Sequence, residues 1–442
     1  MKLFKVFLLV LLIPFIYTQE CTTAQSLYET DSYLEAYEEI IGMGTTVFDN
    51  KECTLLAYNI LFKLENFNEA KTYLDRLLKS EPSNIAYKDL SALLTKVLQN
   101  YKSSKYTLEK IDIDEAIEEY KNILMDADLK NISLFYSGLG LAYKKKFMNS
   151  SLADSMNFEL LDLSINNYER AQTINSKYDD EILNISKYLT TLGKSSMNND
   201  ELEKALTYFT KATEYDSDYS TAHFYLGQLY MKIQDYEFAA QSFKAGLGSK
   251  LKNGNYKILY MLGTCYERMN KLDMAEQCFR YSIANEPTYI KARFSLAKVY
   301  YTQLNHDKSK STIFDILDMD PEYIKAYELL VNVCLDQNNY SSARKYIAEG
   351  ISVDSKSYFL YSQLALLDNE DENYDIAMSN AKIALDLKRN YGPALIQLGR
   401  SYTFLCKSVE AEDAFKRAKR WSRDQAKHWQ GWATGYHKEI CK

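Results

Sequence analysis

Proline is scarce in this sequence, and its few copies avoid the interiors of the predicted helices. The chain has 5 prolines in 442 residues. Pro82, Pro287 and Pro321 fall where apolar helical patterns end. Pro393 falls in a first helical turn, where its missing N–H costs little. Because no proline interrupts a predicted helix, long helices can follow one another along the chain.

The sequence also lacks the residue clusters that enzymes and metal sites need. It has 4 histidines, and none lies near a cysteine or carboxylate motif typical of a triad or a metal site. His437 and Cys441 lie four apart on one helix face, but two ligands do not make a metal site. There is no glycine-rich phosphate loop, no G-x-S-x-G and no H-E-x-x-H. We therefore expect no catalytic residues, no metal and no cofactor, and we expect that the protein is not an enzyme.

Long apolar runs are rare, and the one that stands out lies at the N-terminus. Two lysines in Met1–Lys5 are followed by an apolar run, Val6–Tyr17. This run is too short to span a bilayer comfortably, and it contains Pro14. The pattern is typical of a secretory signal peptide, which we assign to residues 1–19, with an uncleaved signal anchor as the alternative.

A signal peptide predicts an extracytoplasmic protein, either periplasmic or secreted, with the ER lumen as an alternative. No other stretch of the sequence could cross a membrane, so we expect no membrane contact beyond the signal segment. The formal net charge of the whole chain is −7. An acidic chain repels phosphates, which argues against nucleic acid as a partner.

The 7 cysteines of an exported chain permit disulfides, and their odd number leaves at least one unpaired. The candidate pairs are Cys21–Cys53, Cys406–Cys441 and Cys265–Cys278. The last two cysteines lie level with each other on the antiparallel helices of one predicted hairpin. Cys334 occupies a large-aromatic position of the pattern described next, and we expect it to be a buried thiol.

The strongest pattern in the sequence is a repeat of 34 residues. Leucines recur at this interval just after the start of five apolar helical patterns: Leu262, Leu296, Leu330, Leu364 and Leu398. The phrase Pro287-Thr-Tyr-Ile-Lys-Ala returns as Pro321-Glu-Tyr-Ile-Lys-Ala at the same spacing. A period of 34 residues is that of a two-helix solenoid repeat. We therefore expect Leu296, Leu330 and Leu364 to be buried between helices.

The residues around each leucine resemble the tetratricopeptide repeat (TPR) family. One unit reads Leu262-Gly263, Tyr266, Ala275, Phe279 and Pro287, and another reads Leu398-Gly399, Tyr402, Ala411, Phe415 and Ala418. The resemblance implies an all-α fold, a right-handed α-solenoid superhelix of about ten helical hairpins with a C-terminal capping helix. It also implies that the protein holds partners and does not catalyse a reaction.

The regularity of the repeats divides the chain into five segments. We assign residues 1–19 to the signal peptide, 20–50 to an N-terminal helical segment with a lone helix near residues 31–41, 51–185 to degenerate repeats, 186–425 to a regular array and 426–442 to a capping helix.

The resemblance also suggests where a partner binds, because the first helix of each TPR lines a concave groove. Three lysines hold one equivalent position there in successive repeats, and other candidate residues lie beside them. The predicted partner-binding residues are Lys257, Tyr260, Lys291, Phe294, Lys298, Lys325 and Asn332. They favour a protein or peptide ligand that is acidic. The alternative is a series of solvated helix starts, repeated because the repeats were duplicated.

All three tryptophans lie close together near the C-terminus, in a basic stretch. The last repeat of a solenoid exposes an apolar face that must be covered. We expect Trp429 and Trp432 to be buried in covering it. The alternative is that these residues and Trp421 form a basic and aromatic patch that docks on an anionic partner, an envelope polymer or a lipid headgroup. On that interpretation the protein would be an envelope- or glycan-associated binding module that also uses its tyrosine-rich surfaces.

Overall fold

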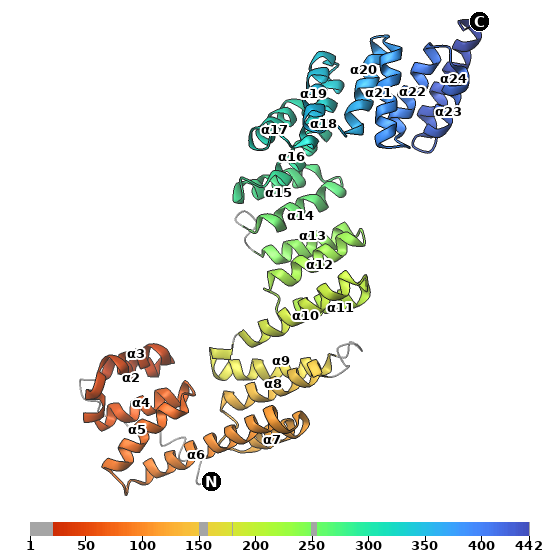
Figure 1. Ribbon diagram of the computed structural model, residues 1–442. Helices are drawn as coiled ribbons and strands as arrows, with labels where there is room; N and C mark the ends of the chain where they lie inside the picture. Colours follow the sequence, from red (N-terminus) through yellow and green to blue (C-terminus); the bar gives the residue numbers. More distant parts are fainter. Residues whose placement is uncertain (1–20, 150–157, 179, 249–253, 442) are drawn as a thin grey trace. The chain divides into compact units, whose positions relative to one another are not determined.

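The computed structural model describes residues 21–149, 158–178, 180–248 and 254–441. Within these ranges it contains 23 α-helices and no β-strand (Figure 1). The predicted signal peptide lies outside the described residues. The chain divides into two compact units, unit 1 at Met1–Leu226 and unit 2 at Gly227–Lys442.

Unit 1 is built of helices that pair with their neighbours in sequence. They are α2 (Thr22–Glu29), α3 (Tyr33–Gly42), α4 (Lys51–Lys63), α5 (Phe67–Ser80), α6 (Ile85–Tyr106), α7 (Ile113–Met125), α8 (Ser133–Asn149), α9 (Glu159–Ile174), α10 (Asp180–Asn198) and α11 (Leu202–Tyr215). Short helical turns complete the unit at η1 (Gly44–Asp49), η2 (Thr107–Ile111) and η3 (Ser176–Tyr178). Two helices, α2 and α3, precede residue 51, so the expectation of a lone helix there was wrong.

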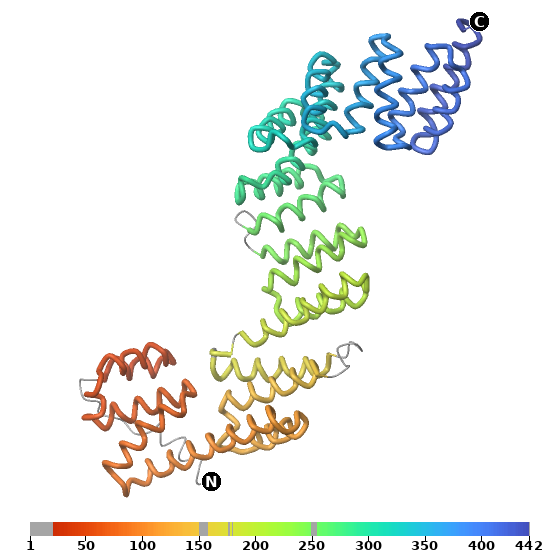
Figure 2. The backbone as a smooth tube through the Cα atoms, in the orientation of Figure 1, coloured from red at the N-terminus to blue at the C-terminus, as the bar shows by residue number. Residues whose placement is uncertain are grey.

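Unit 2 continues the same pairing with more uniform helices. The boundary between the units falls within α12 (Ser220–Lys232). The helices that follow are α13 (Tyr236–Leu247), α14 (Tyr256–Arg268), α15 (Leu272–Asn285), α16 (Ile290–Thr302), α17 (His306–Met319), α18 (Ile324–Asp336), α19 (Tyr340–Val353), α20 (Tyr358–Glu370), α21 (Tyr374–Leu387), α22 (Gly392–Phe404), α23 (Ser408–Ala418) and α24 (Arg423–Glu439). Consecutive helices of the unit run antiparallel (Figure 2).

The tight turn inside each hairpin of unit 2 has one residue with a left-handed backbone. These residues are Gln234, Asn270, Leu304, Asn338, Glu372 and Cys406, with φ between +54° and +65°. The next residue often starts the second helix by capping it. For example, the Asn305 side chain accepts a hydrogen bond from the N–H of Lys308, a favourable arrangement at a helix N-terminus. The 34-residue period therefore fixes the turns as well as the core.

Each hairpin of unit 2 matches a small residue on its first helix with a residue of suitable size on its second. A Cβ added at Gly263 would lie 2.7 Å from the Phe279 ring, and one at Gly399 would lie 2.5 Å from Phe415. Where the second helix carries a smaller side chain, the first helix carries a larger one. The pairs are Ala297 with Ile313, Val331 with Ile347 and Ala365 with Ala381, all buried. In the first two pairs a larger side chain on the first helix offsets the loss of the ring, whereas Ala365 and Ala381 are both small.

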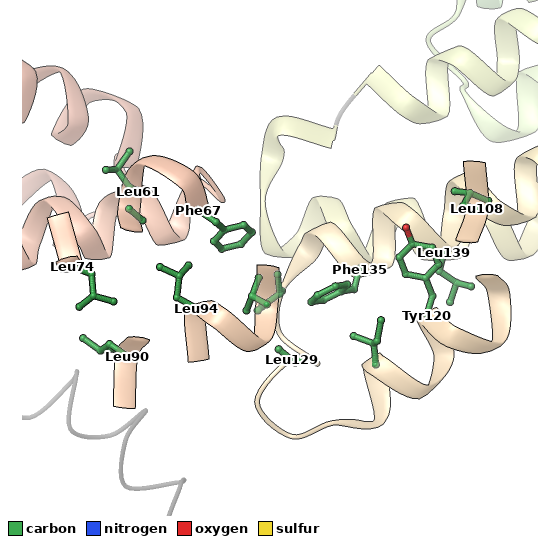
Figure 3. Close-up of a cluster of buried hydrophobic side chains, with 14 of the residues drawn as sticks. Leu61, Phe67, Leu74, Leu90, Leu94, Leu108, Tyr120, Leu129, Phe135 and Leu139 are labelled. Carbon is green, nitrogen blue, oxygen red and sulfur yellow. The ribbon is translucent and has the colours of Figure 1, made fainter. Parts of the chain in front are cut away.

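The five leucines of the 34-residue series lie in or beside the core. Leu262, Leu296, Leu330 and Leu398 are buried. Leu364 is only half-buried, so the prediction that it is buried between helices is confirmed only in part. In unit 1, which has less regular repeats, Leu94, Phe135 and other apolar side chains from successive helices form one continuous cluster (Figure 3).

Disulfides close both ends of the described chain. Cys21, which precedes α2, is bonded to Cys53 of α4, and Cys406 is bonded to Cys441 after α24. Both pairings were predicted from the sequence. The third predicted pair, Cys265–Cys278, was wrong, because both cysteines are free, buried thiols. Cys334 is also free and buried, as expected.

Helix α24 packs on α22 and α23, as a capping helix should. It starts at Arg423, three residues earlier than predicted. The side chains that it buries are Ala426 and Ala433, which let it approach the last hairpin closely. The expected burial of the tryptophans was therefore wrong for Trp432, which is 40% exposed, while Trp429 is half-buried.

Candidate functional site

The predicted groove residues lie on three first helices of unit 2. Besides its neighbours in sequence, α14 contacts α16, and α16 contacts α18. The first helices therefore lie side by side and form one continuous surface. Lys257 and Tyr260 lie on α14, Phe294 on α16 and Asn332 on α18.

The structure brings two of the three equivalent lysines together. Lys291 and Lys325 line the same surface depression, which has a volume of about 530 Å³. Apolar and aromatic side chains, Tyr289, Ile290, Tyr323 and Ile324, line it too. The third lysine, Lys257, is exposed on α14, with its Nζ 5.6 Å from the centre of the Tyr256 ring.

Two further candidates are less available than the sequence suggested. The Nζ of Lys298 lies 2.8 Å from Glu267 Oε1 in an ion pair, so this lysine already has a carboxylate partner. Asn332 is half-buried and lies outside the depression. The candidate site therefore includes fewer residues than the seven that were predicted.

Tyr260 and Phe294 belong to an aromatic row that sequence reasoning recognised only in part. The Tyr260 ring centre lies 5.3 Å from that of Tyr289, and Tyr256 lies 5.0 Å from Tyr289. Phe294 packs against Tyr323 at 5.5 Å. Edge-to-face contacts of this kind hold the rings in defined orientations.

Tyr289 and Tyr323 were missed as site residues although the sequence carried a signal for them. Both stand in the recurring Pro-x-Tyr-Ile-Lys-Ala phrase, one residue before a first helix begins. Burial is the main cause of a raised pKa at both Tyr289 and Tyr323. At Tyr289 the neighbouring phenols of Tyr260 and Tyr256 raise the pKa further. Both phenols therefore stay neutral at physiological pH and can donate hydrogen bonds.

The aromatic row ends at Glu328, which holds the position equivalent to Tyr260 and Phe294. Burial raises the pKa of the Glu328 carboxyl, although the Ser357 hydroxyl, 2.9 Å away, and Lys325 act in the opposite direction. A half-buried carboxyl at this place gives the surface a polar boundary beside Lys325.

The chemistry of the surface is that of binding. It offers exposed ammonium groups beside aromatic and aliphatic side chains. Among the described residues there is no group of three histidine, cysteine or acidic side chains placed to hold a metal ion. The helices in the described ranges also include none with the length and apolarity needed to span a membrane.

Comparison with known proteins agrees with the helical pairing. The family described as tetratricopeptide repeat matches residues 53–84, 190–257 and 256–289. The chain contains tetratricopeptide repeats. The matched TPR segments include α14 and α15, and the third segment ends at Tyr289 of the depression.

One curated relative and several solved structures resemble parts of this chain. Protein bimA of Emericella nidulans is 30% identical over 97 residues, which cover 22% of this chain and 12% of that protein. The chain therefore matches about an eighth of that relative's length.

Three of the similar solved structures each have 20% sequence identity or less. A tetratricopeptide repeat protein from Parabacteroides merdae has 15% identity and a TM-score of 0.48, covering 57% of this chain and 99% of that one. YrrB, described as a TPR protein with an unusual peptide-binding site, has 20% identity and a TM-score of 0.36. The match covers 44% of this chain and 95% of YrrB. PilF of Pseudomonas aeruginosa has 16% identity and a TM-score of 0.41, covering 48% and 96%.

Proposed function

We propose that the protein is an exported scaffold that binds an acidic, partly apolar segment of another protein on the first helices of unit 2. The observation that carries this proposal is the shared depression of Lys291 and Lys325, with Tyr289 and Tyr323 in its wall. The lysines supply charge, and the rings supply apolar area. Together they recognise a carboxylate that lies next to an apolar side chain.

The depression also contains two carboxylates, and they restrict how a ligand can lie. Asp320 accepts a hydrogen bond of 3.1 Å from the N–H of Glu322, so one of its oxygens is engaged in its own turn. Glu322 is exposed at the rim. A ligand carboxylate placed near Glu322 would be repelled, so the acidic group must face Lys291 and Lys325. Such repulsion contributes to specificity.

The disulfides support the proposed export. Cys21–Cys53 and Cys406–Cys441 close the two ends of the described chain, and such bonds persist mainly in oxidising compartments. Together with the apolar N-terminal run, this supports the proposal of a periplasmic or secreted location. Detection of the chain in a cell fraction outside the cytoplasm, with residues 1–19 removed, would support it. Retention in the cytoplasm would count against it.

Binding can be tested with short fluorescent peptides in which Glu is paired with Leu or Phe. The variant Lys257→Glu/Lys291→Glu/Lys325→Glu should lose binding, and wild-type binding should weaken as salt rises. A matched control is Lys271→Glu/Lys345→Glu/Lys382→Glu, which reverses three exposed lysines away from the first helices. Peptides with Lys in place of Glu should not bind. If both triple variants bound the peptide equally well, Lys257, Lys291 and Lys325 would have no specific role in binding.

A second candidate function rests on an aromatic surface at the C-terminal end of unit 2. Phe404 stacks on Tyr374 with ring centres 4.2 Å apart, and it also contacts Trp432 at 5.1 Å and Tyr436 at 5.3 Å. Trp432 is exposed and the other three rings are half-buried, and together they offer an aromatic face for glycans. Retention on cell-envelope polysaccharide that is lost in Trp432→Ala would support this function, whereas retention unchanged in Trp432→Ala would exclude it.

A further inference from the structure

Two loops at the end of unit 2 form one surface. The loop between α21 and α22 contains Lys388 and Arg389, and the turn between α23 and α24 contains Trp421. Arg417 Nη2 donates a hydrogen bond of 3.1 Å to the carbonyl oxygen of Arg389. Trp421 packs directly on Gly392, where an added Cβ would lie 2.1 Å from the Trp421 Cγ.

This surface is strongly basic. We call it the basic edge and define it by Lys388, Arg389, Arg417, Lys419, Arg420, Trp421 and Arg423. Arg417 has a carboxylate neighbour, Asp413, at 3.7 Å. For Arg389, Arg420 and Arg423 the described part of the chain supplies no salt bridge, and all three are exposed. The edge has six cations against Asp413 and Asp424, so it is net positive in a chain of net charge −7, and it therefore favours an anionic partner.

The equivalent loops of the preceding hairpins carry the opposite or mixed charge. Glu286 stands in the loop before α16, and Asp320 and Glu322 stand in the loop before α18. The loop before α20 has both Asp354 and Lys356. Earlier in unit 2, the sequence between α13 and α14 is basic as well, with Lys250 and Lys252. The positive charge of the basic edge is thus not shared by the three loops that come immediately before it.

We propose that the basic edge docks on the surface of an anionic lipid bilayer, with Trp421 at the level of the headgroups. Trp421 is 51% exposed and stands on a turn between two helices, flanked by Arg420 and Arg423. Tryptophan prefers the membrane–water interface, and clustered basic residues are attracted to anionic headgroups.

This proposal departs from the expectation that only the N-terminal segment meets a membrane. It is independent of the groove, which lies on α14, α16 and α18. Docking of this kind needs no membrane-spanning helix. Because the cations are exposed, screening by salt should reverse it.

Sedimentation with lipid vesicles tests the proposal directly. Wild-type chain should bind vesicles of three parts phosphatidylcholine to one part phosphatidylglycerol, and binding to pure phosphatidylcholine should be at least tenfold weaker. The variant Arg389→Glu/Arg420→Glu/Arg423→Glu should lose more than tenfold in binding. The matched control Lys71→Glu/Lys79→Glu/Lys88→Glu reverses three exposed lysines of unit 1 and should bind like wild type. Equal binding to both kinds of vesicle, or equal loss in both variants, would overturn the proposal.

Two further measurements separate a lipid surface from a soluble acidic partner. Tryptophan fluorescence should shift to the blue when anionic vesicles are added, and the shift should be lost in Trp421→Phe, which keeps a ring against Gly392. Soluble polyglutamate provides the comparison. Binding to polyglutamate with no binding to vesicles would assign the basic edge to an acidic protein and would overturn the lipid proposal. Unchanged helical circular dichroism shows that each variant is folded.

Discussion

The Glu65 carboxylate accepts a hydrogen bond of 2.8 Å from the hydroxyl of Tyr178, a residue 113 positions further along the chain. The same side chain is 5% exposed, pairs with Lys177 at 2.5 Å and accepts a hydrogen bond from the N–H of Leu134 at 2.9 Å. Contacts in a solenoid normally join neighbouring repeats. Here one carboxylate in the α4–α5 turn holds the start of α8 and the turn after α9.

Removal of this carboxylate should destabilise unit 1. We expect Glu65→Ala to cost about 3 kcal/mol, since it leaves the partners of a buried charge unsatisfied. Tyr178→Phe removes one hydrogen bond and should cost about 1 kcal/mol. Chemical denaturation followed by circular dichroism measures both costs. If Glu65→Ala were as stable as wild type, the long-range contact would have no energetic role.

The depth of each repeat leucine predicts how much its truncation costs. Leu330 is fully buried, so Leu330→Ala should cost roughly 2–5 kcal/mol. Leu364→Ala should cost less, because Leu364 is half-buried. Urea unfolding of the two variants side by side tests the order. A larger cost at position 364 would mean that the register of α20 is wrong.

One exposed residue offers a stabilising substitution. Leu304 has φ +59° and is 74% exposed. Asparagine tolerates the left-handed conformation better than leucine does. Leu304→Asn should therefore stabilise the chain by about 0.5–1 kcal/mol. Leu304→Val, which is β-branched, should destabilise it. Thermal unfolding gives the sign for each, and a lower Tm for Leu304→Asn would contradict the assigned turn.

The thiols should fall into two chemical classes. Cys265, Cys278 and Cys334 are free and buried, and burial raises the pKa of the Cys265 and Cys278 thiols to about 12. A thiol reagent at pH 8 should therefore label none of them in the native chain. After denaturation without reductant it should label three, and the four cysteines of the disulfides should react only after reduction. A different count would change the assigned pairing.

Alkaline pH should weaken the fold through its buried phenols. Burial raises the pKa of Tyr391 to about 12, with smaller effects from Tyr358 and Glu328. The folded chain then holds this proton more tightly than the unfolded chain, whose tyrosine pKa is about 10. The stabilisation is complete below pH 10 and is lost as the pH rises towards 12. Tm measured across this range should fall less steeply in Tyr391→Phe.

Features that recur with the period could be predicted from the sequence. The leucine series located the core, and the resemblance located Lys291 and Lys325 on neighbouring first helices. Both terminal disulfides were among the three candidate pairs, because each cysteine had a possible partner near the same end of the chain. Tyr289 was available in the same recurring phrase but was not recognised, because its role depends on contact with the helix of the previous repeat.

Features that depend on single contacts left no periodic trace. Nothing in the residues around Glu65 indicates a partner more than one hundred positions away. Helix α2 was missed because its eight residues have little apolar content. The capping helix was expected to use Trp429 and Trp432, but the small side chains of Ala426 and Ala433 bring its backbone so close to the last hairpin that large rings lie at the rim.

The matched sizes of Gly263 with Phe279, and of Val331 with Ile347, have a consequence for how the array can change. Both members of each pair lie within one hairpin, so duplication of a 34-residue segment copies that internal fit, whereas contacts with the next hairpin, such as Gly350 beside Leu360, must be met again. A hairpin could in this way be added or deleted as a unit. Exchange of only one helix between two hairpins would instead place valine against phenylalanine, and such a recombinant would fail to pack.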